Sequence, residues 1–319
     1  MRYIVIGASA AGISGAKTLR ELDKEAEIIL ISKDTEVYSR CILHHYISNH
    51  RNVEQLNFTS KNFFEEYNIQ WINNVEVTCV NDESKTLTLS NNEVLNFDKL
   101  MICSGASSFI PPVEGLREGN NVVGLRNLED AILIKEQASK VKNVVVLGAG
   151  LVGIDAVSGL IDTGVNVSLV EMGDKVLPIQ LDKYTSDVYK KKFEEKGVNL
   201  KLGVKAEKLI LDENKNPKAL LINTGEEIPC ELVIVATGVR SNINFLSNSN
   251  VECDRFGLII DEKGKTNIDD IYGAGDVTGR NPIWPTAVKE GIIAANNMLG
   301  KEMIMTDFFG SKNTMNFVG

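Results

Sequence analysis

The stretch VVVLGAGLVG, residues 144–153, decides the fold of this chain of 319 residues. Four apolar residues lead into glycines at 148, 150 and 153, and a helical pattern then continues to about Ile161. Thr163-Gly164 ends that helix, and residues 165–170 form a second apolar run. The order of strand, glycine turn, helix and strand predicts a βαβ unit with parallel strands.

The same pattern occurs earlier in the chain. Residues 3–6 (YIVI) precede Gly7, Ser9 and Gly12, a helix follows, and residues 28–31 (IILI) form the next strand. Residues 98–105 (DKLMICSG) also match residues 231–238 (ELVIVATG), each after an alternating stretch typical of an antiparallel meander, at 86–89 and 219–222. The sequence therefore predicts a duplicated α/β fold of two Rossmann-like domains, each with three layers (ββα).

The first domain is predicted to be discontinuous. After Gly238 there is no third copy, but residues 271–277 (IYGAGDV) read as a strand and a glycine turn, and a helix is expected from about 286 to 299. We therefore expect one domain from residues 1–108 plus 240–300, with a second domain, residues 109–239, inserted into it.

The glycine spacing has a chemical meaning. In a GxGxxG turn the first glycine permits the tight turn, the second lets the backbone approach a pyrophosphate, and the third lets helix and strand pack closely. Gly148, Gly150 and Gly153 fill all three places, whereas Ser9 replaces the middle glycine of the first turn. Glu171, 18 residues after Gly153, is expected to bind ribose hydroxyls and to favour NADH over NADPH. Ser32 occupies the equivalent place in the first half.

Composition excludes several classes of protein. The formal net charge is −9, from 43 acidic and 34 basic residues, which disfavours nucleic acid and anionic membranes as partners. No apolar stretch reaches the roughly 18 residues of a membrane span. Five scattered cysteines without a CxxC motif favour a cytoplasmic location. We predict no metal site, because Cys41 and the three neighbouring histidines have no second cluster of ligands.

Together these motifs resemble the FAD- and NAD(P)H-dependent pyridine nucleotide-disulfide oxidoreductase superfamily, over about residues 1–300. The resemblance implies FAD in the first domain and NADH in the second. It places Gly7, Ser9, Gly12, Ser32, Ser104, Gly105 and Asp276 at FAD, and Gly148, Gly150, Gly153, Glu171 and Gly238 at the nucleotide turns of the second half. Asp155 matches the place of a family glutamate beside the nicotinamide.

Residues 37–47 (VYSRCILHHYI) resemble two subfamilies. Tyr38-Ser39-Arg40 with Leu43 is similar to the flavin domains of NADH:rubredoxin reductases, ferredoxin reductases and NADH nitrite reductases. That likeness implies that Arg40, Arg126 and Trp284 lie by FAD, and that His45 replaces a lysine beside flavin N5. Cys41 with Leu43 and Tyr46 instead resembles the single-cysteine signature of coenzyme A disulfide reductases and NADH oxidases.

These likenesses lead to one functional hypothesis with two alternatives. We expect an FAD flavoprotein that passes hydride from NADH to FAD and electrons to a small redox protein such as rubredoxin, with Cys41, His45 and Asp155 as the catalytic candidates. The first alternative is a coenzyme A disulfide reductase or NADH oxidase that uses Cys41 on a low-molecular-weight disulfide. The second is an FAD- and NAD-binding subunit or redox sensor without turnover.

Two further expectations concern neighbouring contacts. Cys41 and His45, four residues apart, would share one helical face, with His45 close to Asp155 and partly protonated. Residues 301–319 are expected to be the stub of a missing C-terminal dimerisation domain, so that a dimer forms only if that domain is present.

Overall fold

The computed structural model describes residues 1–305 and divides the chain into two compact units. Unit 1 contains Met1–Ser39, Asn57–Ser107 and residues 240–305, and unit 2 contains Arg40–Leu56 and Ser108–Val239. The chain passes between them at β8 (Ala106–Ser108) and β17 (Val239–Ser241), which pair as a two-stranded sheet. Most of the predicted stub, residues 306–319, lies outside the described residues.

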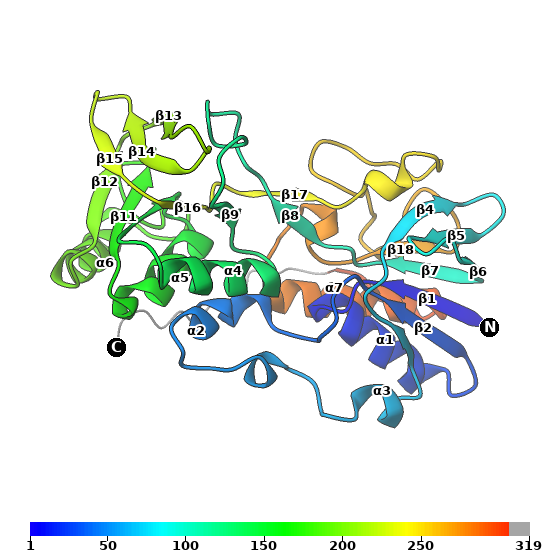
Figure 1. The fold of residues 1–319 in the computed structure, drawn as a ribbon. Helices are drawn as coiled ribbons and strands as arrows, with labels where there is room; N and C mark the ends of the chain where they lie inside the picture. The colour runs from blue at the N-terminus through cyan, green and yellow to red at the C-terminus, as the bar shows by residue number, and fades with distance from the viewer. Residues whose placement is uncertain (306–319) are drawn as a thin grey trace. The chain divides into compact units, whose positions relative to one another are not determined.

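Unit 1 is built on a parallel sheet of five strands (Figure 1). The sheet order is β18 (Ile271–Gly273), β7 (Lys99–Ile102), β1 (Arg2–Ile6), β2 (Glu27–Ile31) and β3 (Gln70–Ile72). Helices α1 (Ala10–Leu22) and α7 (Trp284–Met298) cover one face, and the short helix α3 (Phe63–Glu66) precedes β3. On the other face lies the antiparallel meander β4 (Val77–Asn81), β5 (Thr86–Leu89) and β6 (Val94–Asn96).

Alternation along β1 explains why its sheet needs a layer on both faces. Tyr3 and Val5 join the apolar cluster beneath α1 and α7, whereas Ile4 and Ile6 join the cluster beneath the meander. Successive side chains of a strand point to opposite faces, so a run that is apolar at every position can be buried only between two layers. The pairing of Tyr3 with Ile28 and of Ile4 with Leu100 continues both clusters across the sheet.

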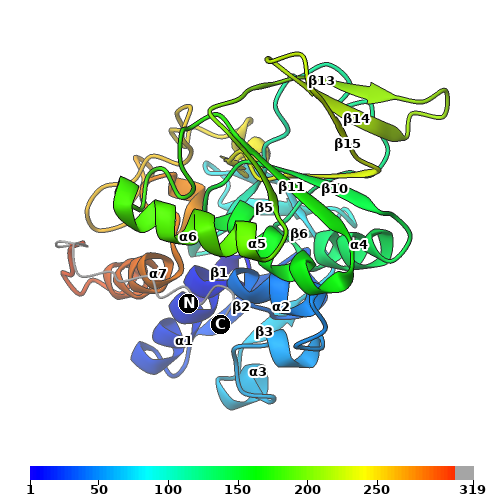
Figure 2. The ribbon, with the colours of Figure 1, turned by 90° about the vertical axis from the view of Figure 1, so that its left-hand side faces the viewer.

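Unit 2 repeats this plan, as Figure 2 shows. Its parallel sheet has the order β12 (Asn199–Leu202), β11 (Asn166–Glu171), β10 (Asn143–Leu147), β16 (Leu232–Val235) and β9 (Val122–Gly124). The meander β13 (Ala206–Leu211), β14 (Pro217–Ile222) and β15 (Glu227–Pro229) covers one face. Helices α4 (Leu128–Ala138), α5 (Leu151–Leu160) and α6 (Lys183–Glu195) belong to the other side. The predicted α/β class with Rossmann-like ββα layers is confirmed.

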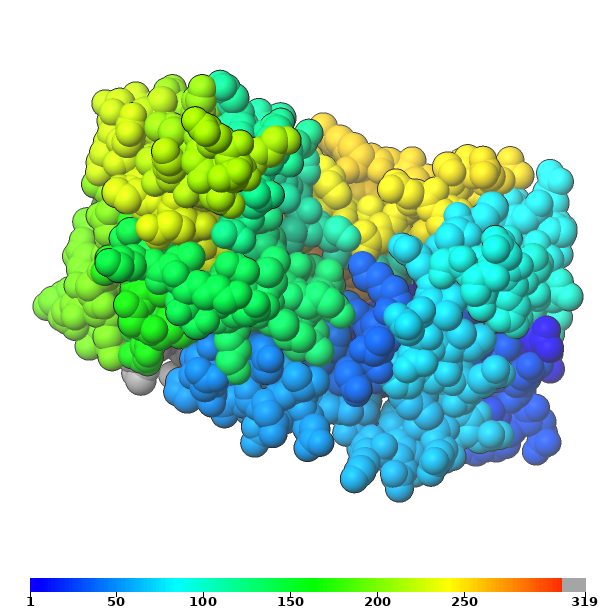
Figure 3. Space-filling model, viewed as in Figure 1, coloured from blue at the N-terminus to red at the C-terminus, as the bar shows by residue number. Residues whose placement is uncertain are grey.

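Residues 40–56 belong to unit 2, although the sequence analysis placed them in the first domain. They contain η1 (Arg40–Ile42), α2 (Leu43–Ile47) and η2 (Glu54–Leu56). Helix α2 packs against α4 and α5, and in Figure 3 this blue segment lies directly against the green surface of those helices. Gly159 permits the approach, because a Cβ there would lie 3.0 Å from the His44 carbonyl oxygen. Packing, rather than position along the chain, determines this assignment.

Three short helical turns complete the described fold: η3 (Ile161–Thr163), η4 (Asn244–Leu246) and η5 (Asp276–Thr278). Within residues 1–305, no helix combines the length and the apolar character needed to cross a membrane.

Candidate functional site

The first glycine turn connects β1 to α1 in unit 1. Gly7 has a φ of +110°, and a Cβ at that position would lie 2.1 Å from the carbonyl oxygen of Cys103. A Cβ on Gly12 would lie 1.8 Å from the carbonyl oxygen of Gly7. Ser9 precedes α1, and its hydroxyl makes no capping hydrogen bond. The N–H groups of the first helical turn and this hydroxyl can therefore serve as donors to an anion.

The second glycine turn, between β10 and α5, has nearly the same geometry. Gly148 has a φ of +101°, and a Cβ on Gly153 would lie 1.8 Å from the carbonyl oxygen of Gly148. Gly150 differs from Gly148 and Gly153, since a Cβ on Gly150 would meet no atom within 4 Å. The first and third glycines are thus required by the fold itself, whereas the second glycine leaves open space beside the backbone.

Glu171, the last residue of β11, lies at this second turn. Its Oε2 accepts a hydrogen bond of 2.7 Å from the Ala149 N–H, and its Oε1 accepts one of 2.7 Å from the Gly173 N–H. Both bonds hold the carboxylate beside the glycine turn. Each oxygen keeps a further lone pair that can accept a hydroxyl group.

The two strand-end turns lie beside the glycine turns. Gly105 and Gly238 have φ values of +68° and +122°. The Ser104 hydroxyl donates to the Asn242 carbonyl oxygen at 2.7 Å, and the Asn242 side chain donates to the Ser104 carbonyl oxygen at 2.9 Å. Because the Ser104 hydroxyl proton is already used, the contact of Ser104 with a cofactor stays a prediction and would involve its backbone.

Ser32 is less available than the sequence suggests. Its hydroxyl accepts a hydrogen bond from the Trp71 indole N–H at 3.1 Å and donates to the Asp34 carbonyl oxygen at 3.2 Å. The Asp34 carboxylate, two residues later, accepts a bond of 3.0 Å from the Tyr38 hydroxyl and is also buried. Asp34 is a candidate that the sequence analysis missed. An acid close to the end of β2 is the signal that could have found it.

The expected contact between His45 and Asp155 is wrong in its choice of histidine. The His44 Nδ1 atom lies 3.7 Å from the Asp155 Oδ1 atom. The rings of His44 and His45 are 4.1 Å apart, and His45 in turn faces His50 at 6.1 Å. Helix α2 begins only at Leu43, and its packing on α5 turns His44 toward Asp155. Cys41 precedes this helix, within η1, so it does not share a helical face with His45.

Burial determines the protonation of the His44–Asp155 pair. It raises the pKa of Asp155 to about 7 and lowers the pKa of His44 to about 4. Burial and nearby Arg51 also lower the pKa of His45, against the expectation of a partly protonated ring. The Nδ1 atom of His44 is buried and has no hydrogen-bond partner in the described part of the chain. At slightly acidic pH the pair is therefore neutral, with its proton on Asp155.

The cysteines differ in their exposure. Cys41 is exposed, Cys79 and Cys253 are half-buried, and Cys103 and Cys230 are buried. Burial raises the pKa of the Cys230 thiol to about 12, which makes that thiol inert near neutral pH. Residues 1–305 contain no group of three or more side chains arranged to hold a metal ion.

The remaining predicted residues are divided between the two units. Arg40 and Arg126 belong to unit 2, the first in η1 and the second just before α4. Asp276 begins η5 in unit 1. Trp284 begins α7, where its ring meets the ring of Phe58 edge-on at 4.6 Å.

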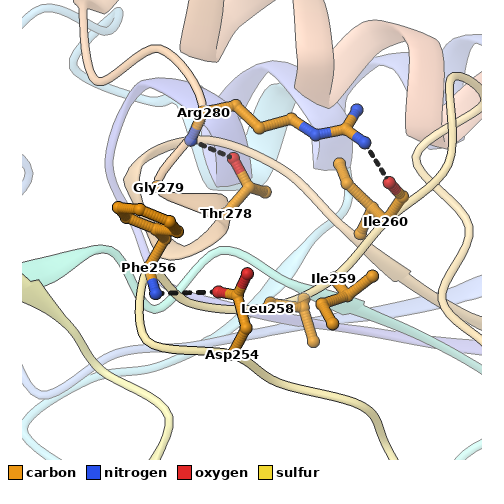
Figure 4. Close-up of a pocket in the computed structure, with 8 residues that line it drawn as sticks. All are labelled: Asp254, Phe256, Leu258, Ile259, Ile260, Thr278, Gly279 and Arg280. Atoms are coloured by element: carbon orange, nitrogen blue, oxygen red, sulfur yellow. Dashed lines mark hydrogen bonds between the residues drawn. The ribbon is translucent and has the colours of Figure 1, made fainter.

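A shallow pocket of about 310 Å³ lies on unit 1 and is lined by side chains from residues 254–260 and 278–280 (Figure 4). Phe256, Ile259, Thr278 and Arg280 are among the residues that line it. The Arg280 guanidinium donates to the carbonyl oxygens of Ile260 and Asp261, which joins the two chain segments that line the pocket. None of the residues predicted as catalytic or cofactor-binding lines this pocket.

The residues of both units fit the cofactors that the sequence implies. In unit 1, the Ser9 hydroxyl lies beside the N-terminus of α1 without capping that helix, and the buried Thr286 Oγ1 atom has no hydrogen-bond partner within residues 1–305. In unit 2, the open space at Gly150 lies directly at the N-terminus of α5. Donor groups and free space of this kind suit the pyrophosphate of a dinucleotide.

Comparison with known proteins agrees with these features. The family model described as pyridine nucleotide-disulphide oxidoreductase matches residues 1–291. An NADH oxidase of Methanocaldococcus jannaschii is 32% identical over 95% of this chain and 71% of its own length. An NADH-rubredoxin oxidoreductase of Clostridium acetobutylicum is 26% identical over 97% of this chain and 78% of its own length.

A solved structure shares the fold closely. The NAD-dependent persulfide reductase from A. fulgidus has a TM-score of 0.88 and 28% identity, covering 96% of this chain and 60% of the reductase chain.

Proposed function

Because the chain belongs to the pyridine nucleotide-disulphide oxidoreductase family, it is an NAD(P)H-dependent flavoprotein oxidoreductase, and we propose that it transfers electrons from NADH through FAD to a small redox protein. FAD and NADH are the cofactors of this family. One observation carries the proposal: the chain has two glycine turns, and in each a Cβ added to the third glycine would lie 1.8 Å from the carbonyl oxygen of the first. Two such turns equip one chain for two dinucleotides.

Unit 1 is the proposed FAD-binding unit. The N–H groups at the start of α1 and the Ser9 hydroxyl would bind the pyrophosphate, and Asp276 would accept hydrogen bonds from the ribityl hydroxyls. Asp34 would take the ribose role expected of Ser32, since the Ser32 hydroxyl is already bonded on both sides. When bound, FAD supplies the redox chemistry that links a two-electron donor to an acceptor.

Unit 2 is the proposed NADH-binding unit. The start of α5 would bind the pyrophosphate, and Glu171 would accept hydrogen bonds from the adenine ribose. Asp155 would lie on the nicotinamide side, where its carboxyl holds a proton next to His44 Nδ1 at slightly acidic pH. A neutral pair there avoids an unpaired buried charge beside the reacting ring.

The proposed electron acceptor is supported by sequence motifs, a relative and the exposure of one cysteine, rather than by the glycine turns. The Tyr38-Ser39-Arg40 motif, the presence of Trp284 and the similarity to an NADH-rubredoxin oxidoreductase favour a small redox protein such as rubredoxin. The exposure of Cys41 favours a second candidate, a low-molecular-weight disulfide such as coenzyme A disulfide. Reduction of a disulfide requires an accessible thiolate, which the exposed position allows.

The decisive experiment uses the full chain loaded with FAD. Anaerobic addition of NADH should bleach the oxidised flavin, and oxidised rubredoxin should then restore its absorbance. Restoration by coenzyme A disulfide instead, lost in Cys41→Ser, would move the assignment to disulfide reduction. Flavin that NADH does not reduce would contradict both, and would favour a nucleotide-binding subunit or sensor without turnover.

A further inference from the structure

Glu290 is a buried carboxylic acid that no step of the proposed reaction uses. It lies in the middle of α7 with 1% of its surface exposed. Its Oε2 atom accepts a hydrogen bond of 2.6 Å from the N–H of Gly275. A carboxyl group so deeply buried is costly to keep ionised, so its retention here calls for an explanation.

The bond from Gly275 fixes the turn that presents Asp276. Gly275 has a φ of +81°, which an L side chain rarely adopts. A Cβ on Gly275 would also lie 3.1 Å from the Ala11 Cβ atom, so the turn lies against the first turn of α1. Glu290 therefore supports the backbone immediately before the residue proposed to bind the ribityl chain.

Helix α7 approaches the same end of α1. A Cβ on Gly291 would lie 2.2 Å from the carbonyl oxygen of Ala11. Ala11 belongs to the first turn of α1, whose N–H groups are the proposed pyrophosphate donors. Glu290, next to Gly291 in the chain, is consequently a buried acid close to the place where the anionic part of FAD would bind.

Few charged groups face the Glu290 carboxyl. Asp276 disfavours its ionised form, Arg280 favours it, and the Cys103 thiol just after β7 is a further titratable neighbour. On α1, the small residue Ala11 lies against both Gly275 and Gly291. Burial raises the pKa of Glu290 to about 7, so that small changes in the surrounding charge alter its protonation at neutral pH.

We propose that Glu290 is a positioning residue that holds the Gly275–Asp276 turn ready for FAD and couples FAD binding to the uptake of one proton. The inference rests on the proposed binding of FAD to unit 1. The Gly275 N–H bond to Oε2 persists in both protonation states, while the proton taken from solvent resides on Oε1. The negative pyrophosphate near Ala11 favours that protonated form, since like charges disfavour ionisation.

The coupling of proton binding to FAD binding sets the direction in which FAD affinity changes with pH. If FAD binding raises the proton affinity of Glu290, FAD must bind more weakly as the pH rises above about 7. A rise of about one pKa unit in the complex corresponds to roughly tenfold weaker binding at about pH 9 than at about pH 6. With a rise of that size, calorimetry in buffers of different ionisation enthalpy should detect an uptake that peaks at about half a proton per FAD near about pH 7.5.

The test compares the apo form of the full chain with three variants, with FAD affinity as the readout. Glu290→Gln keeps an acceptor for the Gly275 N–H but cannot ionise, so its FAD affinity should stay close to the low-pH value of the unaltered protein at every pH. Glu290→Ala loses the bond and should bind FAD more weakly at every pH. Glu302→Gln, an exposed substitution in the same unit, should keep the slope of the unaltered protein.

The possible outcomes separate the proposed role of Glu290 from the proposed FAD site. An equal pH slope in Glu290→Gln and the unaltered protein, or FAD binding by the unaltered protein without proton uptake, would overturn the inference but leave the FAD site intact. Absence of FAD binding at any pH would overturn the proposed FAD site as well. Should Glu290→Gln fail to fold, the proton uptake measured on the unaltered protein still decides the inference.

Discussion

Gly150→Ala should separate the binding of NADH from the stability of the fold. Gly150 has a φ of −76° and a ψ of −173°, which any residue adopts, and an added Cβ would meet no atom within 4 Å. Alanine lowers the entropy of the unfolded chain but is a poorer N-cap than glycine, and these effects nearly offset each other. We therefore expect the free energy of unfolding to change by less than about 1 kcal/mol.

The same methyl group should weaken NADH binding considerably. It would occupy the space into which the pyrophosphate must come close to the backbone. Crowding by one methyl group in a close-fitting site costs about 1–3 kcal/mol, which corresponds to roughly 5- to 150-fold in Kd. Isothermal titration of the full chain with NADH measures this change, and urea unfolding measures the stability.

Gly153→Ala is the matched control, because its Cβ would lie 1.8 Å from the Gly148 carbonyl oxygen. The added Cβ would clash with a backbone atom, which cannot move aside as a flexible side chain can. The free energy of unfolding of this variant should therefore fall by about 3 kcal/mol or more. Ser9 shows that a side chain is compatible with the turn geometry at the middle position of the first turn. Unchanged NADH affinity in Gly150→Ala would refute the assignment of this turn to the pyrophosphate.

Three other predictions follow from the site. Glu171→Gln should narrow the preference for NADH over NADPH by roughly tenfold in kcat/KM, since it removes the like charge that faces a 2′-phosphate; an unchanged ratio would contradict the role of Glu171. Cys41→Ser should leave rubredoxin reduction nearly intact and abolish any reduction of coenzyme A disulfide, as single-turnover mixing with each acceptor would reveal. Asp155→Asn should stabilise the protein at about pH 8 by about 1–3 kcal/mol and much less at about pH 4, because the raised pKa of Asp155 means that stability is lost as the pH rises through about 7. Urea unfolding at both pH values tests this, and equal effects at the two values would show that the ionised Asp155 carboxylate is not the cause.

The sequence by itself determined the features that depend on local backbone geometry. The glycines at 7, 12, 148 and 153 are needed wherever a strand turns directly into a packed helix, so their spacing predicted both turns before any contact was known. Apolar runs such as residues 3–6 predicted strands buried on both faces, and the repeated pattern predicted two copies of one fold. Such signals are encoded within a few neighbouring residues, which is why they can be recognised without the structure.

The tertiary structure alone decided how distant residues meet. Packing of α2 on α5 brought His44 rather than His45 to Asp155 and placed residues 40–56 in unit 2. The bond from Trp71 engaged the Ser32 hydroxyl, and α7 carried Glu290 to the Gly275 turn. Each of these contacts joins separate elements of the chain, and the choice among adjacent side chains depends on helix starts and close approaches that packing sets. No local pattern encodes that choice, because neighbouring residues of a helix differ by about 100° in direction.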